Sequence, residues 1–491
     1  MNEELLKIYE DNTNEYGLPV FDLFTWQNLN SQYLDPDTSL PMSKRAKVMI
    51  DTMIHFFKKH KPKFPFRDFD DHEVRQNFYA LKDLNLKDNI FPKEKCKTVH
   101  EKYDDYVGNF PEWGMGILNF SSNYNNISDM FMNRERMKCS YDRSPSPITM
   151  WNDQTDLKQI LSPIWRLHPD CGMPLKNNLY IEGVRVGAYF ATQFKPSVAK
   201  AFYDFTKSKK VLDTSSGWGD RMAGFFASNA EEYYGMDPNG DLHKNYHSMA
   251  IKYSEWLGAE NPQTETGDNW FQVEGKWKTL GVDYRKKVKI YRSPAEDLPW
   301  DEIPDDIDIM FSSPPYFATE RYAEGSKFEN DQSWSRYNSY EAWRDGFYLP
   351  VMKKVFEKLA PGGWLMVNIM DPKVKGKRHK SCDDLVNDLK EYFVGQIGMR
   401  IMARPKSIKS FEGDTHEERK AKYDEWQAKW FIESVWCFRK PDPSNNNDDI
   451  FAPYKDSTLD GMGPIVVQQP IKKKKLSEAT TEKSSLEGFF D

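Results

Sequence analysis

The segment Ser313-Pro314-Pro315-Tyr316 places hydrogen-bond acceptors beside a flat aromatic ring. It follows the apolar run 309–311, which predicts a buried strand that stops at the carboxyl edge of a sheet. Proline has no N–H and fixes φ, so the carbonyls of Ser313 and Pro314 are expected to be rigid and unpaired. A planar group with an exocyclic amine could stack on Tyr316 and donate to these oxygens. The structural alternative is a Pro-Pro turn that merely ends a core strand.

A second group of polar residues lies upstream, at the ends of two other predicted strands. Asp213 ends an apolar run and precedes a turn with Gly217 and Gly219. Glycine lets a ligand approach the backbone closely, and a carboxylate at a strand end can accept from an ammonium or a hydroxyl group. The short strand 232–236 then ends in Asp237, where a Rossmann-like unit holds ribose hydroxyls. These residues predict a cofactor site.

The elements that position these residues alternate between strand and helix. Pro196 is placed to begin an amphipathic helix that ends near Phe205. Strands are predicted at 209–212, 232–236, 288–292, 308–312, 359–370, 393–404 and 431–438. This alternation predicts an α/β fold with a mostly parallel sheet and right-handed crossovers. Residues 318–340 are expected to form a mobile loop beside the cleft, and 413–429 a charged helix.

Three domains are predicted along the chain. Residues 1–165 are expected to be mainly helical with irregular parts, residues 166–440 form the α/β domain, and residues 441–491 form a disordered tail. In the first domain, 43–59 predicts a helix capped by Ser43. Its apolar side is Val48, Met49, Met53, Ile54 and Phe57, and its basic side with its extension is Lys44, Arg45, Lys47, Lys58, Lys59, Lys61, Lys63 and Arg67. These basic residues could bind nucleic-acid phosphates or form an ordinary solvated face.

Composition narrows the class of protein. The 491 residues carry a formal charge of -7, so any nucleic-acid contact must come from local basic patches. The five cysteines are scattered, with no CxxC pair and no histidine at ligand spacing, which disfavours a metal site or a disulfide framework. No apolar run approaches the length needed to span a bilayer. A soluble cytoplasmic protein without a metal is therefore expected.

An ordered set of four motifs along the chain resembles those of amino-group DNA methyltransferases. Residues 213–219 (DTSSGWG) are similar to the family's DPFAGSG loop, and 313–316 to its (D/N/S)PPY motif. Residues 192–196 (TQFKP) resemble the HPTxKP segment, and 359–369 the L-x-P-G-G strand. The resemblance covers residues 185–440. It implies a Rossmann-like class I methyltransferase domain that uses S-adenosyl-L-methionine.

The resemblance also implies roles for individual residues. The target base would be flipped out and stacked on Tyr316, with the Ser313 side chain and the Pro314 carbonyl accepting from its amine. Asp213 would bind the methionine ammonium and Asp237 the ribose. The remaining cofactor-binding residues would be Lys195, Pro196, Ser215, Gly217, Trp218 and Gly219, and Pro315 would complete the catalytic motif.

This chain departs from the family pattern at three places. Ser215 replaces the usual Phe of the glycine loop, Phe194 interrupts the TxKP segment, and Pro294 stands where an Asp usually holds the adenine. A serine at the first SPPY position is commoner among N4-cytosine enzymes than among N6-adenine enzymes, which favours cytosine. Methylation of RNA or of a protein glutamine remains an alternative. So does a DNA-binding accessory protein whose cofactor site has decayed.

The last residues of the chain carry a separate resemblance. Leu486, Phe489 and Phe490 are spaced to share one face of a helical turn capped by Ser485. This peptide is similar to the C-terminal peptides with which T-even-type phage proteins bind their sliding clamp. It implies a phage enzyme in the host cytoplasm that is tethered to DNA by its tail. Docking of the tail on its own domain is the alternative.

Overall fold

The computed structural model describes residues 1–91, 116–141, 144–154, 156–168, 170–401 and 408–444. The chain forms two compact units. Unit 1 contains residues 1–71, 129–192 and 320–329, and unit 2 contains residues 72–128, 193–319 and 330 onward. The units interleave along the chain, whereas the boundaries expected at 165 and 440 divide it into consecutive blocks. Residues 320–329, expected to belong to a loop beside the cleft, are part of unit 1.

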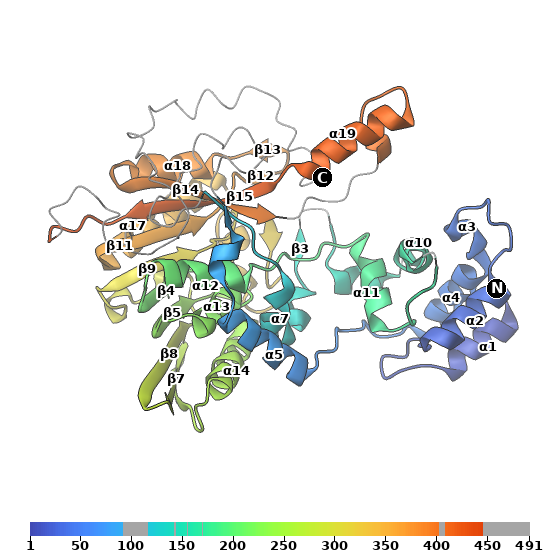
Figure 1. The fold of residues 1–491 in the computed structure, drawn as a ribbon, viewed down its shortest axis with the longest axis horizontal. Helices are drawn as coiled ribbons and strands as arrows, with labels where there is room; N and C mark the ends of the chain where they lie inside the picture. Colours follow the sequence, from blue (N-terminus) through green and yellow to red (C-terminus); the bar gives the residue numbers. More distant parts are fainter. Residues whose placement is uncertain (92–115, 142–143, 155, 169, 402–407, 445–491) are drawn as a thin grey trace. The chain divides into compact units, whose positions relative to one another are not determined.

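Unit 1 is mainly helical (Figure 1). Its helices are α1 (Glu3–Asp11), α2 (Leu23–Tyr33), α3 (Met42–Arg45), α4 (Lys47–His60), α8 (Pro147–Asp153), α9 (Leu157–Leu161), α10 (Pro163–Leu167) and α11 (Asn177–Arg185), together with most of α7 (Asn126–Arg136). Strand β3 (Ser140–Tyr141) pairs antiparallel with β10 (Glu320–Arg321). The core is aromatic and includes Trp26, Trp151 and Trp165.

The helix predicted at 43–59 is present, but it begins later than expected. Ser43 lies inside the short helix α3, and the N-cap of α4 is Ala46. The prediction that Ser43 caps this helix is therefore wrong. Met49, Met53 and Phe57 are buried as predicted, whereas Val48 is exposed, because α4 turns Ile50 and Phe56 inward instead.

Unit 2 is built on a sheet of eleven strands. Its order is β1-β2-β14-β15-β11-β9-β4-β5-β8-β7-β6. The strands are β1 (Ile90–Phe91), β2 (Ile117–Leu118), β4 (Lys210–Asp213), β5 (Glu232–Met236), β6 (Gln263–Thr266), β7 (Trp270–Thr279), β8 (Val282–Tyr291), β9 (Ile307–Ser312), β11 (Leu359–Asn368), β14 (Phe393–Ile401) and β15 (Phe431–Arg439). A separate hairpin joins β12 (Lys373–Val374) to β13 (Lys377–Arg378).

The centre of this sheet is Rossmann-like. Strands β8, β5, β4, β9 and β11 are mutually parallel. On one side of them β15 runs antiparallel to β11 and β14, and on the other side β7 runs antiparallel to β8. Strand order reverses between β4 and β9, the position where open α/β sheets bind ligands. Asp213 pairs with Gly235, and Ser312 pairs with Val367. The predicted α/β fold is thus confirmed, and the carboxyl ends of β4, β5, β9 and β11 meet at one edge.

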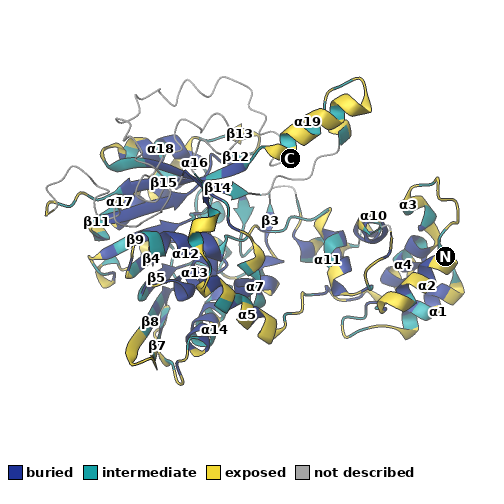
Figure 2. Cartoon of the chain, in the orientation of Figure 1, coloured by how far each residue is buried: buried dark blue, intermediate teal, exposed yellow. Residues whose placement is uncertain are grey.

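Both faces of the central sheet are covered by helices. Helices α16 (Tyr340–Trp343), α17 (Leu349–Lys358) and α18 (Ser381–Asp388) share a core with one face, and α12 (Pro196–Phe205), α13 (Asp220–Ala227) and α14 (Gly240–Trp256) contact the other. Helix α5 (Asp71–Lys82) packs on α14, and the short α15 (Ser333–Arg336) has no buried residue. Met310 packs in the core that contains the buried residues of α17 and α18, whereas the ring of Phe311 lies 4.8 Å from that of Phe202 in α12. Strand β9 is buried except at Asp308, and β11 is buried from Gly363 onward (Figure 2). Burial on both faces explains why the sequence of β9 is apolar without alternation.

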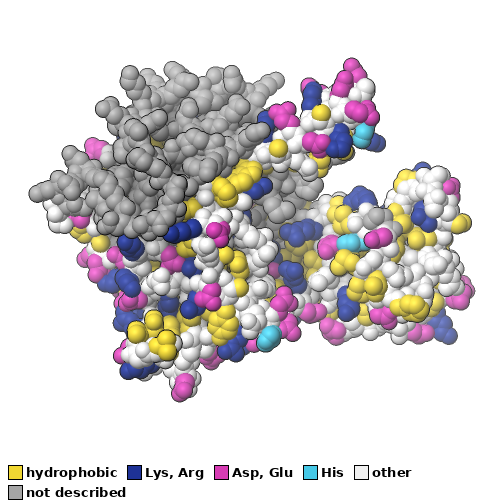
Figure 3. Space-filling view, in the orientation of Figure 1, with side chains coloured by type: hydrophobic (Ala, Val, Ile, Leu, Met, Phe, Trp, Pro, Cys, Tyr) yellow, Lys and Arg dark blue, Asp and Glu magenta, His cyan; other side chains and the backbone are white. Residues whose placement is uncertain are grey.

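Three parts of unit 2 bear on the expectations from the sequence. The strand predicted at 288–292 is β8, which begins at Val282. Its first residues pair antiparallel with β7, and this hairpin was not predicted. The charged helix at 413–429 is present as α19 (His416–Ala428), with no buried residue. Figure 3 shows basic, acidic and histidine side chains together on it. Within the described ranges, no helix is both long and apolar enough to cross a membrane.

A buried lysine, Lys286, donates hydrogen bonds to carbonyls at and just after the carboxyl end of α13. The Nζ atom of Lys286 donates to the carbonyls of Phe225 at 3.0 Å and Ser228 at 2.8 Å, and also to that of Ala230. We expect Lys286→Met to lower the free energy of unfolding by about 2–4 kcal/mol, because it leaves buried carbonyls without donors. Chemical denaturation would measure the loss, with Lys276→Met on the exposed part of the same hairpin as the control. Equal stability of the two variants would contradict this account.

Candidate functional site

The SPPY segment lies where β9 ends at the carboxyl edge of the sheet. Ser313, Pro315 and Tyr316 are half-buried, and Pro314 is buried. The chain turns directly after them, since the Phe317 amide donates to the Pro315 carbonyl at 2.8 Å and Phe317 has φ of +55°. Among the described residues, no backbone amide donates to the carbonyls of Ser313 or Pro314. Two acceptors therefore lie beside the Tyr316 ring.

The Tyr316 hydroxyl is held by residues from two neighbouring strands. It donates to the Glu433 carboxylate of β15 and lies 3.5 Å from the carbonyl of Asn368 at the end of β11. The Asn368 amide in turn donates to the Ser434 carbonyl at 3.1 Å. Burial raises the pKa of Glu433, opposed by the hydrogen bonds from Tyr316 and Asn368 and by the positive charge of Lys195. Burial, followed by the Glu433 charge, also raises the pKa of Tyr316.

Neither Glu433 nor Asn368 was identified from the sequence. Each is a polar residue inside an apolar strand, in FIESVWCF and WLMVNIM respectively. A polar side chain at such a position needs a partner when the strand is buried, and this was a usable signal. What the sequence could not show is that the partner is Tyr316, which is distant along the chain.

We expect Glu433 to position the Tyr316 ring for its substrate. Glu433→Ala should lower kcat/KM for methyl transfer about tenfold, because a hydrogen bond to a charged group contributes about 1.5–3 kcal/mol. Glu433→Gln, which keeps an acceptor, should recover most of the loss. In a double-mutant cycle with Tyr316→Phe, the double variant should be no worse than the worse single variant. Additive losses would contradict the coupling, and Glu417→Ala on exposed α19 is the matched control.

The glycine loop is organised around the fully buried carboxylate of Asp213. Oδ2 accepts from Arg221 Nε at 2.8 Å and from the Tyr233 hydroxyl at 2.6 Å. Oδ1 accepts from the Ser312 hydroxyl at 2.8 Å and from the Ser215 amide at 3.2 Å. A direct contact between Asp213 and a cofactor ammonium remains a prediction. The network shows a second role, which is to join the ends of β4 and β9 and to fix the loop.

Arg221, in the first turn of α13, was not identified from the sequence either. Besides Asp213, it donates to the Ser215 carbonyl inside the loop. Its guanidinium also lies over the ring of Phe194, with Cζ 5.5 Å from the ring centroid. Phe194 is one of the departures from the family pattern, so this departure is accommodated by a cation–π contact next to the loop.

The rest of the loop leaves polar groups available to a ligand. Gly217 and Gly219 have φ of +56° and +75°, which favours glycine. Asp237, half-buried at the end of β5, accepts from the amides of Gly217 at 2.8 Å and Asn239 at 2.9 Å. A carboxylate has about four acceptor positions, so capacity remains for hydroxyl donors. The buried hydroxyls of Thr214 and Ser216 have no hydrogen-bond partner among the described residues.

The other predicted residues occupy supporting positions. Lys195 Nζ donates to the carbonyls of Phe120 at 2.8 Å and Arg400 at 2.7 Å, and burial lowers its pKa to about 8. Pro196 begins α12, and Trp218 is buried. The Ser215 hydroxyl donates to the Thr214 carbonyl at 2.8 Å. Leu486, Phe489 and Phe490 lie outside the described residues.

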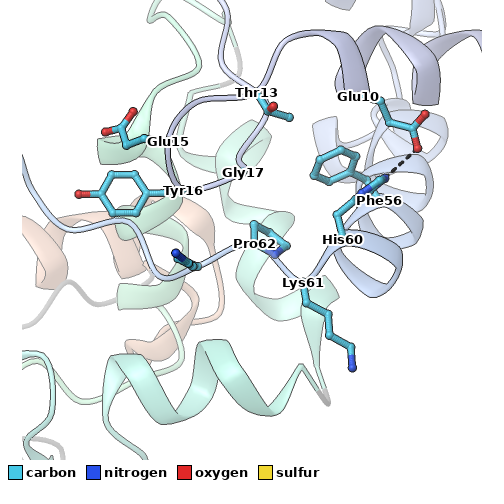
Figure 4. Close-up of a pocket in the computed structure, with 10 residues that line it drawn as sticks. Glu10, Thr13, Glu15, Tyr16, Gly17, Phe56, His60, Lys61 and Pro62 are labelled. Carbon is cyan, nitrogen blue, oxygen red and sulfur yellow. Dashed lines mark hydrogen bonds and ion pairs between the residues drawn. The ribbon is translucent and has the colours of Figure 1, made fainter.

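A pocket in unit 1 contains none of these residues. Figure 4 shows that it is lined by parts of α1 and α4 and the turns near them, with the Glu10 carboxylate 2.8 Å from Nε2 of His60. The hydrogen bond from Lys59 is the largest influence that lowers the pKa of Glu10. Among the residues that the structure describes, no group of three or more His, Cys, Asp or Glu side chains could hold a metal ion.

One family of known proteins matches part of this sequence. The sequence profile of the N6_N4_Mtase family, described as DNA methylase, matches residues 307–459. The match begins at β9, includes the SPPY segment and continues past β15, but it does not include the glycine loop. A search of curated protein sequences finds no match.

Solved structures with a related fold include several methyltransferases. The [4+2]-cyclase SpnF is 12% identical, with 48% of this chain and 75% of that chain covered and a TM-score of 0.25. The mitomycin 7-O-methyltransferase MmcR is 11% identical, with 56% and 60% covered and a TM-score of 0.25. A Mesorhizobium loti S-adenosylmethionine-dependent methyltransferase is 12% identical, with 47% and 90% covered and a TM-score of 0.21. The profile match at the SPPY edge supports methyltransferase chemistry there.

Proposed function

We propose that this protein is a DNA methyltransferase that transfers a methyl group from S-adenosyl-L-methionine to the exocyclic amine of a flipped-out base. The observation that carries the proposal is the position of the SPPY edge. Among the described residues no backbone amide donates to its Ser313 and Pro314 carbonyls, and the Ser312–Asp213 hydrogen bond joins it to the glycine loop. The DNA methylase profile covers that same edge. The serine at position 313 favours N4-cytosine over N6-adenine.

The residues of the edge would act by positioning. The Ser313 side chain and the Pro314 carbonyl accept from the amine, while Tyr316 stacks on the base. These contacts fix the direction of the nitrogen lone pair, so catalysis is mainly orientation and electrostatic stabilisation. Glu433 and Asn368 hold the Tyr316 hydroxyl and thereby the plane of its ring.

The loop residues fit S-adenosyl-L-methionine, which would supply an electrophilic methyl group carried on a sulfonium sulfur. Asp237 would accept from the ribose hydroxyls, and Gly217 and Gly219 would allow close approach to the backbone. The buried hydroxyls of Thr214 and Ser216, for which the described part of the chain supplies no partner, offer further hydrogen bonds. Isothermal titration calorimetry tests this fit. Saturable binding of S-adenosylmethionine by the full chain is expected, whereas no binding by the wild type would favour a decayed accessory protein.

The affinity for the cofactor should depend on pH through Asp237. Burial raises the pKa of this carboxyl to about 6. If the ionised form accepts the ribose hydroxyls, the affinity should fall about tenfold between pH 7 and pH 5, because protonation removes the acceptor. Asp237→Asn should bind more weakly and lose this pH dependence. Calorimetry across this range measures both, and an Asp237→Asn variant that keeps the pH dependence would contradict the assignment.

The raised pKa of Asp237 affects the stability of the free protein in the opposite direction to its effect on cofactor affinity. Folding favours the protonated carboxyl, so the contribution of Asp237 to stability is present below its unfolded pKa and is lost as pH rises through about 6. Cofactor binding and stability should therefore change in opposite directions over this range.

We further propose that the C-terminal peptide tethers the enzyme to a sliding clamp, as the resemblance to T-even-type phage peptides implies. A tether would raise the local concentration of enzyme on newly made DNA. Deletion of residues 484–491 should abolish clamp binding while methylation of short DNA without the clamp continues. Equal clamp binding by the truncated and full-length proteins would refute the tether.

A further inference from the structure

Three exposed arginines of unit 1 each lie over the ring of a phenylalanine. Arg134 Cζ is 4.5 Å from the centroid of Phe66, Arg185 Cζ is 5.3 Å from that of Phe190, and Arg67 Cζ is 5.9 Å from that of Phe69. They come from three separate segments of the chain. Because the guanidinium is planar, stacking on a ring restricts its orientation before any ligand is bound. We call Arg67, Arg134 and Arg185 the arginine surface.

Two members of this surface, Arg67 and Arg185, are close enough for their positive charges to interact. Partial desolvation of the guanidinium lowers the pKa of Arg185, the positive charges of Arg136 and Arg67 lower it further, and the negative charges of Asp129 and Glu182 oppose this shift. Bringing like charges together is unfavourable unless an anion offsets it. The Asp129 carboxylate offsets part of this repulsion at Arg185, but its hydrogen bonds go to the buried Arg136, from whose Nε and Nη2 it accepts at 2.9–3.0 Å.

Other nearby carboxylates also have partners. Asp68 accepts from the Asn177 amide at 3.3 Å, and Glu182 lies 2.8 Å from Nε2 of His168. Across the described ranges, none of the three guanidiniums of the arginine surface forms a hydrogen bond or an ion pair. Most of their donors therefore point into solvent from pre-oriented side chains.

We infer that the arginine surface binds the phosphate backbone of DNA. The inference rests on the proposed function and assigns the DNA contact of unit 1 to residues that the sequence did not single out as a group. A guanidinium can donate two parallel hydrogen bonds to one phosphate, which suits this geometry better than a flexible lysine. The phosphates of DNA would also place negative charge next to the three guanidiniums of the arginine surface.

The alternative is that the arginine stems only cover the phenylalanine rings. The triple variant Arg67→Met/Arg134→Met/Arg185→Met separates the two, because methionine keeps apolar contact but carries no charge. The corresponding triple lysine variant keeps the charge. The matched control is Lys7→Met/Lys158→Met/Lys176→Met, which removes three exposed positive charges from the same unit outside the basic cluster at 44–67.

The test measures binding of the full-length protein to unmethylated duplex DNA at a series of salt concentrations. For the arginine-to-methionine variant, the slope of log K against log salt should become shallower by about 2–3, since each lost phosphate contact contributes about 0.9. The lysine-to-methionine control and the triple lysine variant should keep the wild-type slope. Thermal unfolding verifies that each variant is folded.

Three results would overturn the inference. One is an unchanged slope for the arginine-to-methionine variant, and another is an equal change in the lysine control. The third is tighter binding of the wild type to an RNA duplex of equal length. Methylation of the same DNA by the wild type separates the two claims. If methylation occurs and the slopes do not change, the arginine surface is wrong and the proposed function stands, whereas absence of both binding and methylation by the wild type refutes both.

Discussion

Tyr316→Ala is expected to lower kcat/KM for DNA methylation by about 10²–10³-fold. Stacking of a base on an aromatic ring contributes about 1–3 kcal/mol, and each 1.4 kcal/mol corresponds to tenfold in rate. The change also leaves the buried Glu433 carboxyl without its hydroxyl donor, which adds a further penalty. Steady-state kinetics with unmethylated duplex DNA measures the loss.

Two further measurements identify the source of that loss. Tyr316→Phe keeps the ring and loses only the hydroxyl, so its rate should fall about tenfold or less. The affinity of both variants for S-adenosylmethionine should match that of the wild type, because Tyr316 contacts none of the loop residues in the hydrogen bonds described. Activity of Tyr316→Ala within twofold of wild type would show that the ring is not the platform for the base.

Asp213→Ala is expected to lower the free energy of unfolding by about 3–5 kcal/mol and to abolish cofactor binding. Removing one member of a buried ion pair leaves the other charge uncompensated, and here Arg221 would lose the Asp213 carboxylate, which lies 2.8 Å from its Nε. The hydroxyls of Tyr233 and Ser312 would lose their acceptor as well. Denaturant unfolding gives the stability change.

The double variant Asp213→Ala/Arg221→Met is the control for this mechanism. It also removes the unpaired positive charge of Arg221, so the double variant should be more stable than Asp213→Ala alone. It should still fail to bind the cofactor. A loss below about 1 kcal/mol in Asp213→Ala would contradict the central position of this carboxylate in the loop.

The features that could be predicted from the sequence depend on local chemistry. Strand β5 and the start of α12 have the predicted limits, because an apolar run bounded by turn residues, and a proline at the first helical position, are local signals. The β7–β8 hairpin was missed although the sequence of β7 alternates between apolar and polar residues over 271–274 (FQVE), which is the pattern of a half-buried strand. The predicted third strand therefore covered only the buried end of β8.

What could not be predicted depends on contacts between distant residues. Glu433 meets Tyr316 only because β15 inserts beside β11, which no local pattern encodes. Residues 320–329 join unit 1 because Glu320 and Arg321 pair with Tyr141 and Ser140, far away in sequence. The arginine surface likewise combines three segments whose basic residues look unremarkable one at a time.

The most direct test of the proposed function is transfer of labelled methyl groups from S-adenosylmethionine by the full-length protein to unmethylated DNA, RNA and protein, followed by nucleoside analysis. The account predicts label in DNA as N4-methylcytosine. Label in DNA only as N6-methyladenine would refute the assignment to cytosine and preserve amino-group methylation. Label solely in RNA or protein, or no transfer by a protein that binds the cofactor, would contradict the proposed function.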